Sequence, residues 1–185
     1  SPWTFASKPA GWYRFAQNNG DRANATFELR ENADHSSLIL RIGSSFNNTG
    51  GSSVTVLNHN LYGSSTFQQI RLLTGTTYQP QYLEVYVNPH NNDHQAFYAF
   101  IKDNLLNSGW SLINFTTGSI PGGYTAATYN VDNVFMAAQN GDAESLRLDR
   151  AGNVGIGTTV PGQKLQVAGI IESTSGGFKF PDGTI

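Results

Sequence analysis

Apolar and polar residues alternate over short stretches along most of the chain, and turn-forming residues separate these stretches. The alternating stretches are residues 26–30, 37–42, 53–57, 67–73, 82–87 and 110–115. A period of two places successive side chains on opposite faces of a strand, so each stretch is predicted to be a half-buried strand. The turn-rich linkers between them include residues 18–21 and 44–53. Many short strands at near-regular spacing predict an all-β protein, either a β-sandwich or a barrel, and we expect an antiparallel β-sandwich.

One segment supports two interpretations. Apolar side chains at helical spacing are found at Phe97, Phe100, Ile101 and Leu105. Residues 96–101 also alternate, and an aromatic-rich hexamer after an asparagine-rich turn is typical of a hairpin strand. We predict a strand.

The alternation also assigns the core. The positions predicted to point inward are Phe27, Leu38, Leu40, Val54, Val56 and Phe115. Trp12 adjoins a strand-like start, and we interpret it as a core residue as well.

The pattern changes near residue 146, where large aromatic residues almost disappear. Three glycine-bounded stretches follow one another, at residues 152–157, 164–169 and 177–183. Each offers too few apolar side chains for a single chain to build a core, whereas identical chains in a closed bundle can bury them together. We therefore predict a globular β-module over residues 1–143 and an extended stalk over residues 144–185.

The composition of the chain argues against two classes of function, nucleic-acid binding and membrane insertion. The chain has 185 residues, no cysteine, 13% charged residues and a net charge of −2. A nucleic-acid binder needs a basic face to neutralise phosphates, so we expect no nucleic-acid partner. No apolar run approaches the ~18–20 residues that cross a bilayer, so we expect no membrane insertion. Because the chain begins at Ser1 without a methionine, we expect it to be a fragment of a longer protein.

The end of the chain carries a family resemblance. Residues 146–169 include Gly-Asn-Val-Gly-Ile-Gly-Thr-Thr and a later Lys-Leu-Gln-Val-Ala-Gly. They resemble the segment "GNVGIGTTxPxxKLxVxG" of bacteriophage tail fibres, tailspikes and related bacterial surface or injection-system fibres. Residues 177–185, which contain Phe-Pro-Asp-Gly-Thr, resemble the "FPDGTxQ" element that often follows it. In that family such segments belong to trimeric shafts.

The earlier part of the chain is similar, less specifically, to β-sandwich modules inserted in fibre-like proteins, such as jelly rolls of the C1q/TNF kind. The resemblance implies a homotrimer in a virion tail fibre or at an extracellular surface, with the module attaching to a host-surface glycan or other receptor. Three weak sites that engage one surface together bind strongly. The alternatives are a non-binding spacer of the fibre and a bacterial adhesin or contractile injection-system fibre.

Two stretches resemble cofactor-binding motifs but lack residues or a context that such motifs need. Residues 157–164 lack the adjacent Gly-Lys-Ser/Thr of a phosphate-binding loop, and a strand pattern follows them. His90 and His94 have the spacing of metal ligands on a helix, yet Pro89 and two asparagines place them in a turn. They are weak metal candidates, and we predict neither a metal nor another cofactor.

We expect no enzymatic activity. Without cysteine there is no thiol nucleophile, and no Gly-x-Ser-x-Gly motif occurs. The closest acidic pairs are Glu31 with Asp34 and Asp142 with Glu144, which we interpret as solvated surface groups. A glycan hydrolase is a distant alternative that needs two carboxylates facing each other across a cleft.

Aromatic and amide residues indicate sugar binding, because sugars stack on aromatic rings and their hydroxyls bond to amides and carboxylates. Four tyrosines lie in sequence rich in glycine, serine and threonine that we interpret as loops, where function is common. The candidate ligand-binding residues are Tyr62, Tyr78, Trp110, Tyr124, Tyr129, Asn91 and Asp93. A trimer interface would bury these aromatic residues equally well.

Overall fold

The computed structural model describes residues 3–5, 8–32, 35–48, 51–60, 66–88, 96–103, 109–131, 134–137, 144–149 and 151–181. These residues form strands, turns and extended connections, and no helix occurs among them. The prediction of an all-β protein is confirmed.

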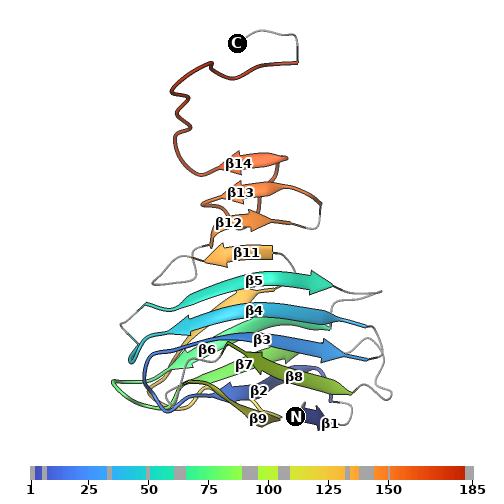
Figure 1. The fold of residues 1–185 in the computed structure, drawn as a ribbon, viewed down its shortest axis with the longest axis vertical. Coiled ribbons are helices and arrows are strands. Elements are labelled where there is room, and N and C mark those ends of the chain that lie inside the picture. Colours follow the sequence, from blue (N-terminus) through green and yellow to red (C-terminus); the bar gives the residue numbers. More distant parts are fainter. Residues whose placement is uncertain are drawn as a thin grey trace.

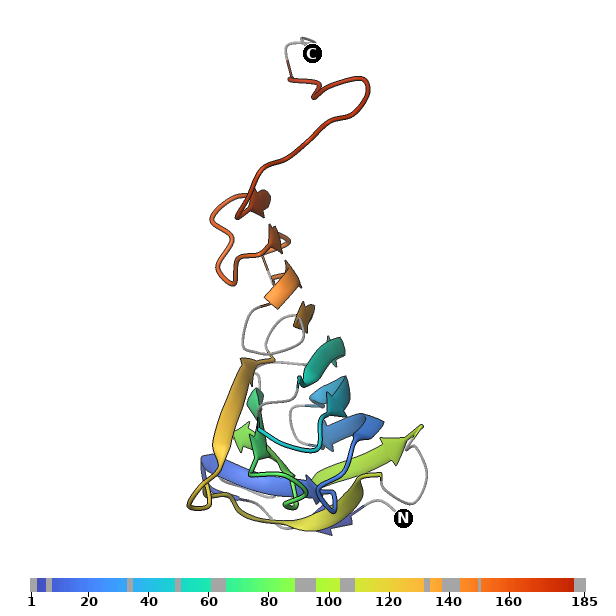
Figure 2. The same ribbon diagram turned by 90° about the vertical axis from the view of Figure 1, so that its left-hand side faces the viewer.

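The strands form two sheets whose inner faces pack together as in a sandwich (Figures 1 and 2). The nine-stranded sheet has the order β1 (Trp3–Phe5), β8 (Phe97–Lys102), β3 (Ala23–Glu31), β4 (Ser37–Ser44), β5 (Ser53–Asn60), β11 (Val134–Ala137), β12 (Glu144–Leu148), β13 (Val154–Ile156) and β14 (Leu165–Val167). The five-stranded sheet has the order β10 (Thr125–Asn130), β6 (Phe67–Thr74), β7 (Tyr82–Val87), β2 (Gly11–Gln17) and β9 (Ser111–Thr117). All described pairings are antiparallel except that of β13 with β14.

The segment around residues 96–101, which the sequence allowed as a helix or a strand, is the strand β8. β8 pairs with β3 on one side and with β1 on the other. Phe97 and Ala99 are buried, while Phe100 faces outward beside the guanidinium of Arg30. The period of two in this segment therefore corresponds to the two faces of a sheet.

The core lies between the two sheets. Phe15 on β2 contacts Phe27 on β3 edge to face, with ring centroids 5.6 Å apart. Trp110 contacts Phe27 from the other side of the cluster at 5.9 Å. All six positions that alternation placed inside are buried: Phe27, Leu38, Leu40, Val54, Val56 and Phe115.

Two predictions in this region were wrong. Tyr129, placed in a loop by the sequence analysis, lies on β10 and is buried, because β10 pairs along its length with β6. Trp12 is only half-buried, since Tyr13 and Phe15 take the inward positions of β2. Its ring lies on the outer face, 4.1 Å below the guanidinium of Arg71.

The sheet that contains β5 continues beyond the sandwich. β11 joins it beside β5 at the pair Thr55 and Met136, and the short strands β12, β13 and β14 follow. These strands and the extended chain up to residue 181 project away from the sandwich in both views (Figures 1 and 2). The exposed apolar residues of this C-terminal segment, residues 144–181, are Leu146, Leu148, Ile156, Val160, Leu165, Ile170, Ile171, Phe178 and Phe180.

Candidate ligand-binding site

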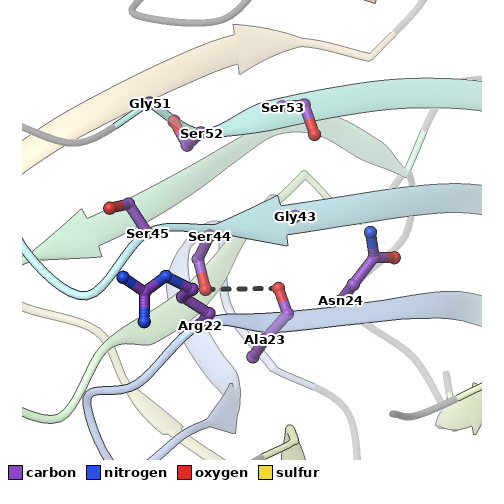
Figure 3. A pocket seen from close by; sticks show the side chains of 9 residues that line it. All are labelled: Arg22, Ala23, Asn24, Gly43, Ser44, Ser45, Gly51, Ser52 and Ser53. Carbon is purple, nitrogen blue, oxygen red and sulfur yellow. Dashed lines mark hydrogen bonds between the residues drawn. The ribbon is translucent and has the colours of Figure 1, made fainter.

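An open pocket of about 510 Å³ lies at one end of β3, β4 and β5. Figure 3 shows its lining residues, which are Arg22, Ala23, Asn24, Gly43, Ser44, Ser45, Gly51, Ser52 and Ser53. Its volume is within the range of small-molecule sites, which span ~300–1,000 Å³. The lining offers serine hydroxyls, one side-chain amide and one guanidinium, so it suits a ligand that is rich in hydroxyl groups.

A glycine lies in the middle of a row of residues that lines the pocket. Asn24, Gly43 and Ser53 stand opposite one another across β3, β4 and β5. A Cβ atom at position 43 would lie 2.8 Å from Ser53 Oγ and 3.5 Å from Asn24 Nδ2. Because the Ser53 hydroxyl already occupies the place that a Cβ would need, a larger residue at position 43 would have to displace it.

The side-chain amide of Asn24 keeps hydrogen-bonding capacity in this row. Its Oδ1 atom is buried and accepts no hydrogen bond from any residue that the structure describes. Buried polar atoms normally have partners, and one without a partner calls for an explanation such as a ligand or a water. Because this oxygen has almost no accessible surface, a ligand in the pocket would contact Asn24 through other atoms of its side chain.

Arg22 joins the pocket to a pair of stacked aromatic rings. Its guanidinium lies 4.5 Å from the centroid of the Phe46 ring. Phe46 in turn stacks on Tyr78, with centroids 5.4 Å apart and planes 28° apart. The side chain of Tyr78 is 61% exposed, so this aromatic pair reaches the surface beside the pocket.

Tyr78 has an unfavourable backbone conformation. Its φ of +58° lies in the left-handed region, which costs a non-glycine residue roughly 1–2 kcal/mol. Its backbone N–H donates to the Phe46 carbonyl at 2.9 Å, and Gly20 packs so closely that a Cβ there would lie 2.5 Å from the Tyr78 carbonyl carbon. These contacts fix the exposed Tyr78 ring at a position where the backbone conformation would suit glycine better.

A single buried asparagine ties together the loops that build the site. Asn18 Nδ2 donates to Ser44 Oγ at 3.2 Å and to Gln81 Oε1 at 2.9 Å. Asn18 Oδ1 accepts from the backbone N–H of Gly20 at 2.8 Å and of Gln81 at 3.2 Å. Gln81 Nε2 donates to the Ser45 carbonyl. The loops near residues 20, 45 and 80 are therefore preorganised by one network.

Of the predicted site residues, Tyr78 is connected to this pocket through Phe46 and Arg22, and it does not line the pocket itself. Tyr124 is half-buried, packs on Tyr82 at 5.7 Å and donates its hydroxyl to the Pro80 carbonyl at 2.8 Å. Burial raises the pKa of Tyr124 above its ordinary value. Trp110 and Tyr129 are each only 2% exposed. Buried rings offer no face to a surface ligand, so Trp110 and Tyr129 are not part of the binding site proposed below.

Several predicted residues lie outside the described residues. They are Tyr62, Asn91, Asp93, His90 and His94. Within the described part of the chain, no group of three or more metal-ligating side chains occurs. Glu31, which we interpreted as solvated, is only 3% exposed, so that interpretation was wrong.

The sequence analysis missed Arg22, Asn24 and the pocket serines. Residues 44–53 contain the signal, a run of serines and glycines, which we had assigned only to a linker. Arg22 gives no local signal, because its role depends on Phe46, which lies in a different loop. Contacts between loops are set by the strand pairings, and periodicity does not report them.

A second polar cluster covers the outer face of the five-stranded sheet. The Glu84 side chain is fully buried, and it accepts from Arg14 at 2.8 Å and from Arg71 at 2.7 Å. Gly118 closes the cluster, since a Cβ there would lie 2.7 Å from the Glu84 carboxylate. The carboxylate and its two cations satisfy one another, and we therefore assign this cluster to stability and not to ligand binding.

No family model, no curated protein and no solved structure matches this chain. A search of the described residues for a helix long and apolar enough to cross a membrane found none.

Proposed function

We propose that this chain is a segment of a homotrimeric, phage-type tail fibre that attaches to a host-surface glycan or another surface receptor. In this proposal residues 1–143 are the receptor-binding module, and residues 144–185 are a shaft shared by three chains. The setting is a virion or an extracellular surface, and the proposed role is binding without catalysis.

The observation that carries the proposal is the exposure of apolar side chains in the C-terminal segment. Ile170 is 97% exposed and Val160 is 81% exposed, and Phe178 and Phe180 are more than half exposed. So many large apolar side chains exposed along one segment support its association with other surfaces. Closed cyclic symmetry lets identical chains cover such a surface completely, which supports a shaft made of several copies.

The sandwich supports the attachment role. Its pocket offers hydroxyls and an amide, and the stacked Phe46 and Tyr78 offer an aromatic face next to it. Sugars present both kinds of surface, with hydroxyls at the edge of the ring and C–H groups on its face. A single shallow polar site binds weakly, and trimerisation would convert three weak contacts into strong attachment.

The finer classification of the module, a jelly roll of the C1q/TNF kind, is part of the proposal. Its support is the pairing of early strands with late ones, since β2 pairs with β9 and β3 pairs with β8. Such nested pairing is the arrangement expected when a long hairpin rolls up into two sheets.

The proposal is tested by attachment to candidate host cells in suspension. The full chain is compared with a version that ends after Asn140, and both carry a fluorescent label. We expect the full chain to bind about 10²-fold or more tightly, because only the trimer engages three receptors at once. Equal and measurable binding by the two forms would contradict the avidity mechanism. Absence of binding by both to every host tested would favour the spacer alternative.

A further inference from the structure

We propose that the pocket at the ends of β3, β4 and β5 binds an acidic saccharide, and that Arg22 binds its carboxylate. This inference rests on the proposed glycan attachment and names the ligand class for it. It starts from the way in which Arg22 differs from other arginines of the sandwich.

Three other arginines of the sandwich are paired with carboxylates. Arg14 and Arg71 both donate to Glu84, and Arg30 donates to Glu28 at 2.5 Å. Arg41, which also lies in the sandwich, donates to the Thr26 hydroxyl at 3.3 Å. Arg22 forms only a long ion pair with Asp21, at 3.7 Å, which is too long for a hydrogen bond. The Arg22 guanidinium thus keeps its donors free of hydrogen bonds to the residues that the structure describes.

The position of Arg22 is nevertheless defined. Its guanidinium lies over the Phe46 ring, and Phe46 is itself stacked on Tyr78. A guanidinium held by an aromatic face keeps its N–H groups directed outward, where they can bind a planar anion in bidentate fashion. The Arg22 side chain is 68% exposed, so an anion at the mouth of the pocket can reach it.

The pocket beside Arg22 fits the rest of a sugar ring. Figure 3 shows the guanidinium at one end of the lining and Asn24 at the other, with the serines of β4 and β5 between them. The Ser44 hydroxyl already donates to the Ala23 carbonyl and accepts from Asn18. The hydroxyls of Ser45, Ser52 and Ser53 can both donate and accept, so they suit the hydroxyls of a sugar. Tyr78 can cover the apolar face of the sugar or of its neighbour in the chain.

The charge of the site favours a carboxylate over a phosphate. Arg22 is the only cationic residue in the described lining of the pocket, and Asp21 lies beside it. One guanidinium matches one carboxylate, whereas a dianionic phosphate would meet a single cation and a nearby negative charge.

The test titrates the full chain with a glucuronic-acid oligosaccharide, the corresponding neutral glucose oligosaccharide and inorganic phosphate, using isothermal calorimetry. The variants are Arg22→Gln and the matched control Arg41→Gln, which removes the same charge from β4 outside the pocket. We expect Arg22→Gln to weaken binding of the acidic oligosaccharide by about tenfold or more. Arg41→Gln should change it by less than about twofold, and added salt should weaken it in the wild type.

The outcomes separate this inference from the proposed function. Equal binding of the acidic and neutral oligosaccharides, or an equal loss in the two variants, would overturn the role of Arg22 and leave glycan attachment in place. Phosphate binding as tight as that of the acidic oligosaccharide would overturn the ligand class. If no oligosaccharide binds, the inference is wrong, and the cell-attachment experiment decides separately whether the proposed function stands.

Discussion

The sandwich and the C-terminal segment differ in the exposure of their apolar side chains. In the sandwich the two sheets cover each other, and side chains such as Phe15, Phe27 and Leu40 are completely buried. In the C-terminal segment β12 to β14 continue one sheet, and among the described residues no second sheet lies over them; in the extended chain that follows, residues such as Ile170 and Phe180 are exposed. The sandwich thus buries its apolar residues within one chain, whereas in the function proposed above other copies of the chain would cover those of the C-terminal segment.

The largest expected effect tests this contrast directly. Phe27→Ala removes a ring that contacts Phe15 and Trp110, so it should lower the free energy of unfolding by about 3–5 kcal/mol. Ile170→Ala should leave the unfolding of the sandwich unchanged within about 0.5 kcal/mol, since nothing in its own chain covers it. Tryptophan fluorescence in urea measures this, because all three tryptophans precede residue 111. Equal effects of the two variants would remove the distinction between the regions.

A smaller loss is expected from Asn18, which holds the site loops together. Asn18→Ala deletes hydrogen bonds to Ser44 and Gln81 and leaves the Gly20 N–H without its acceptor. We expect the free energy of unfolding to fall by about 2–3 kcal/mol, as is usual when buried polar groups lose partners. Asn114→Ala, at an exposed position on β9, is the matched control and should have little effect. A stability loss for Asn114→Ala as large as that for Asn18→Ala would contradict the assigned network.

Tyr78→Gly should separate stability from binding. Relief of the positive φ and loss of the stack on Phe46 have opposite signs and similar sizes, so stability should change by less than about 1 kcal/mol. Binding of the acidic oligosaccharide should nevertheless weaken several-fold, since the aromatic face is lost. Thermal unfolding and calorimetry on the same sample measure both quantities. Unchanged binding would show that the ring has no part in the site.

The smallest expected effect lies in the turn between β12 and β13. The Asp149 carboxylate accepts from the backbone N–H of Asn153 at 2.8 Å and from its side-chain amide at 3.0 Å. The backbone hydrogen bond, followed by the side-chain one, holds the pKa of Asp149 below its ordinary value of 3.8. A depressed folded-state pKa stabilises the turn above pH 3.8, and this contribution is lost as the pH falls through the folded-state pKa.

An NMR titration that follows the backbone amide of Asn153 measures the pKa of Asp149 in this turn. The amide signal should keep its position down to pH values below 3.8 and shift only there, and Asp149→Asn should abolish the transition. A midpoint at or above 3.8 would contradict the proposed hydrogen bonds.

Regular elements were predictable from sequence where side chains alternate strongly. The inward positions of β3, β4 and β5 were predicted correctly, because Phe27, Leu38 and Val54 differ sharply from their polar neighbours. β10 was missed, since its sequence Thr-Ala-Ala-Thr-Tyr-Asn has small residues on both faces and gives little contrast. Pairing with β6, which is distant in sequence, makes it a strand.

The candidate site was largely hidden from the sequence. Arg22, Phe46 and Tyr78 come from three separate loops, and Asn18 holds these loops together from inside. No local pattern reports such contacts, because they depend on strand pairings that bring distant turns to one end of the sheets. Tyr78 was a candidate from its glycine- and threonine-rich surroundings, and those surroundings indicate a loop without identifying its neighbours.

We propose above that copies of the chain bury the exposed apolar residues of the C-terminal segment between them. The molar mass in solution, measured by light scattering, tests this for the full chain and for the version that ends after Asn140. We expect three times the mass of one chain for the full chain and a monomer for the shortened version. A monomeric full chain at micromolar concentration would contradict it.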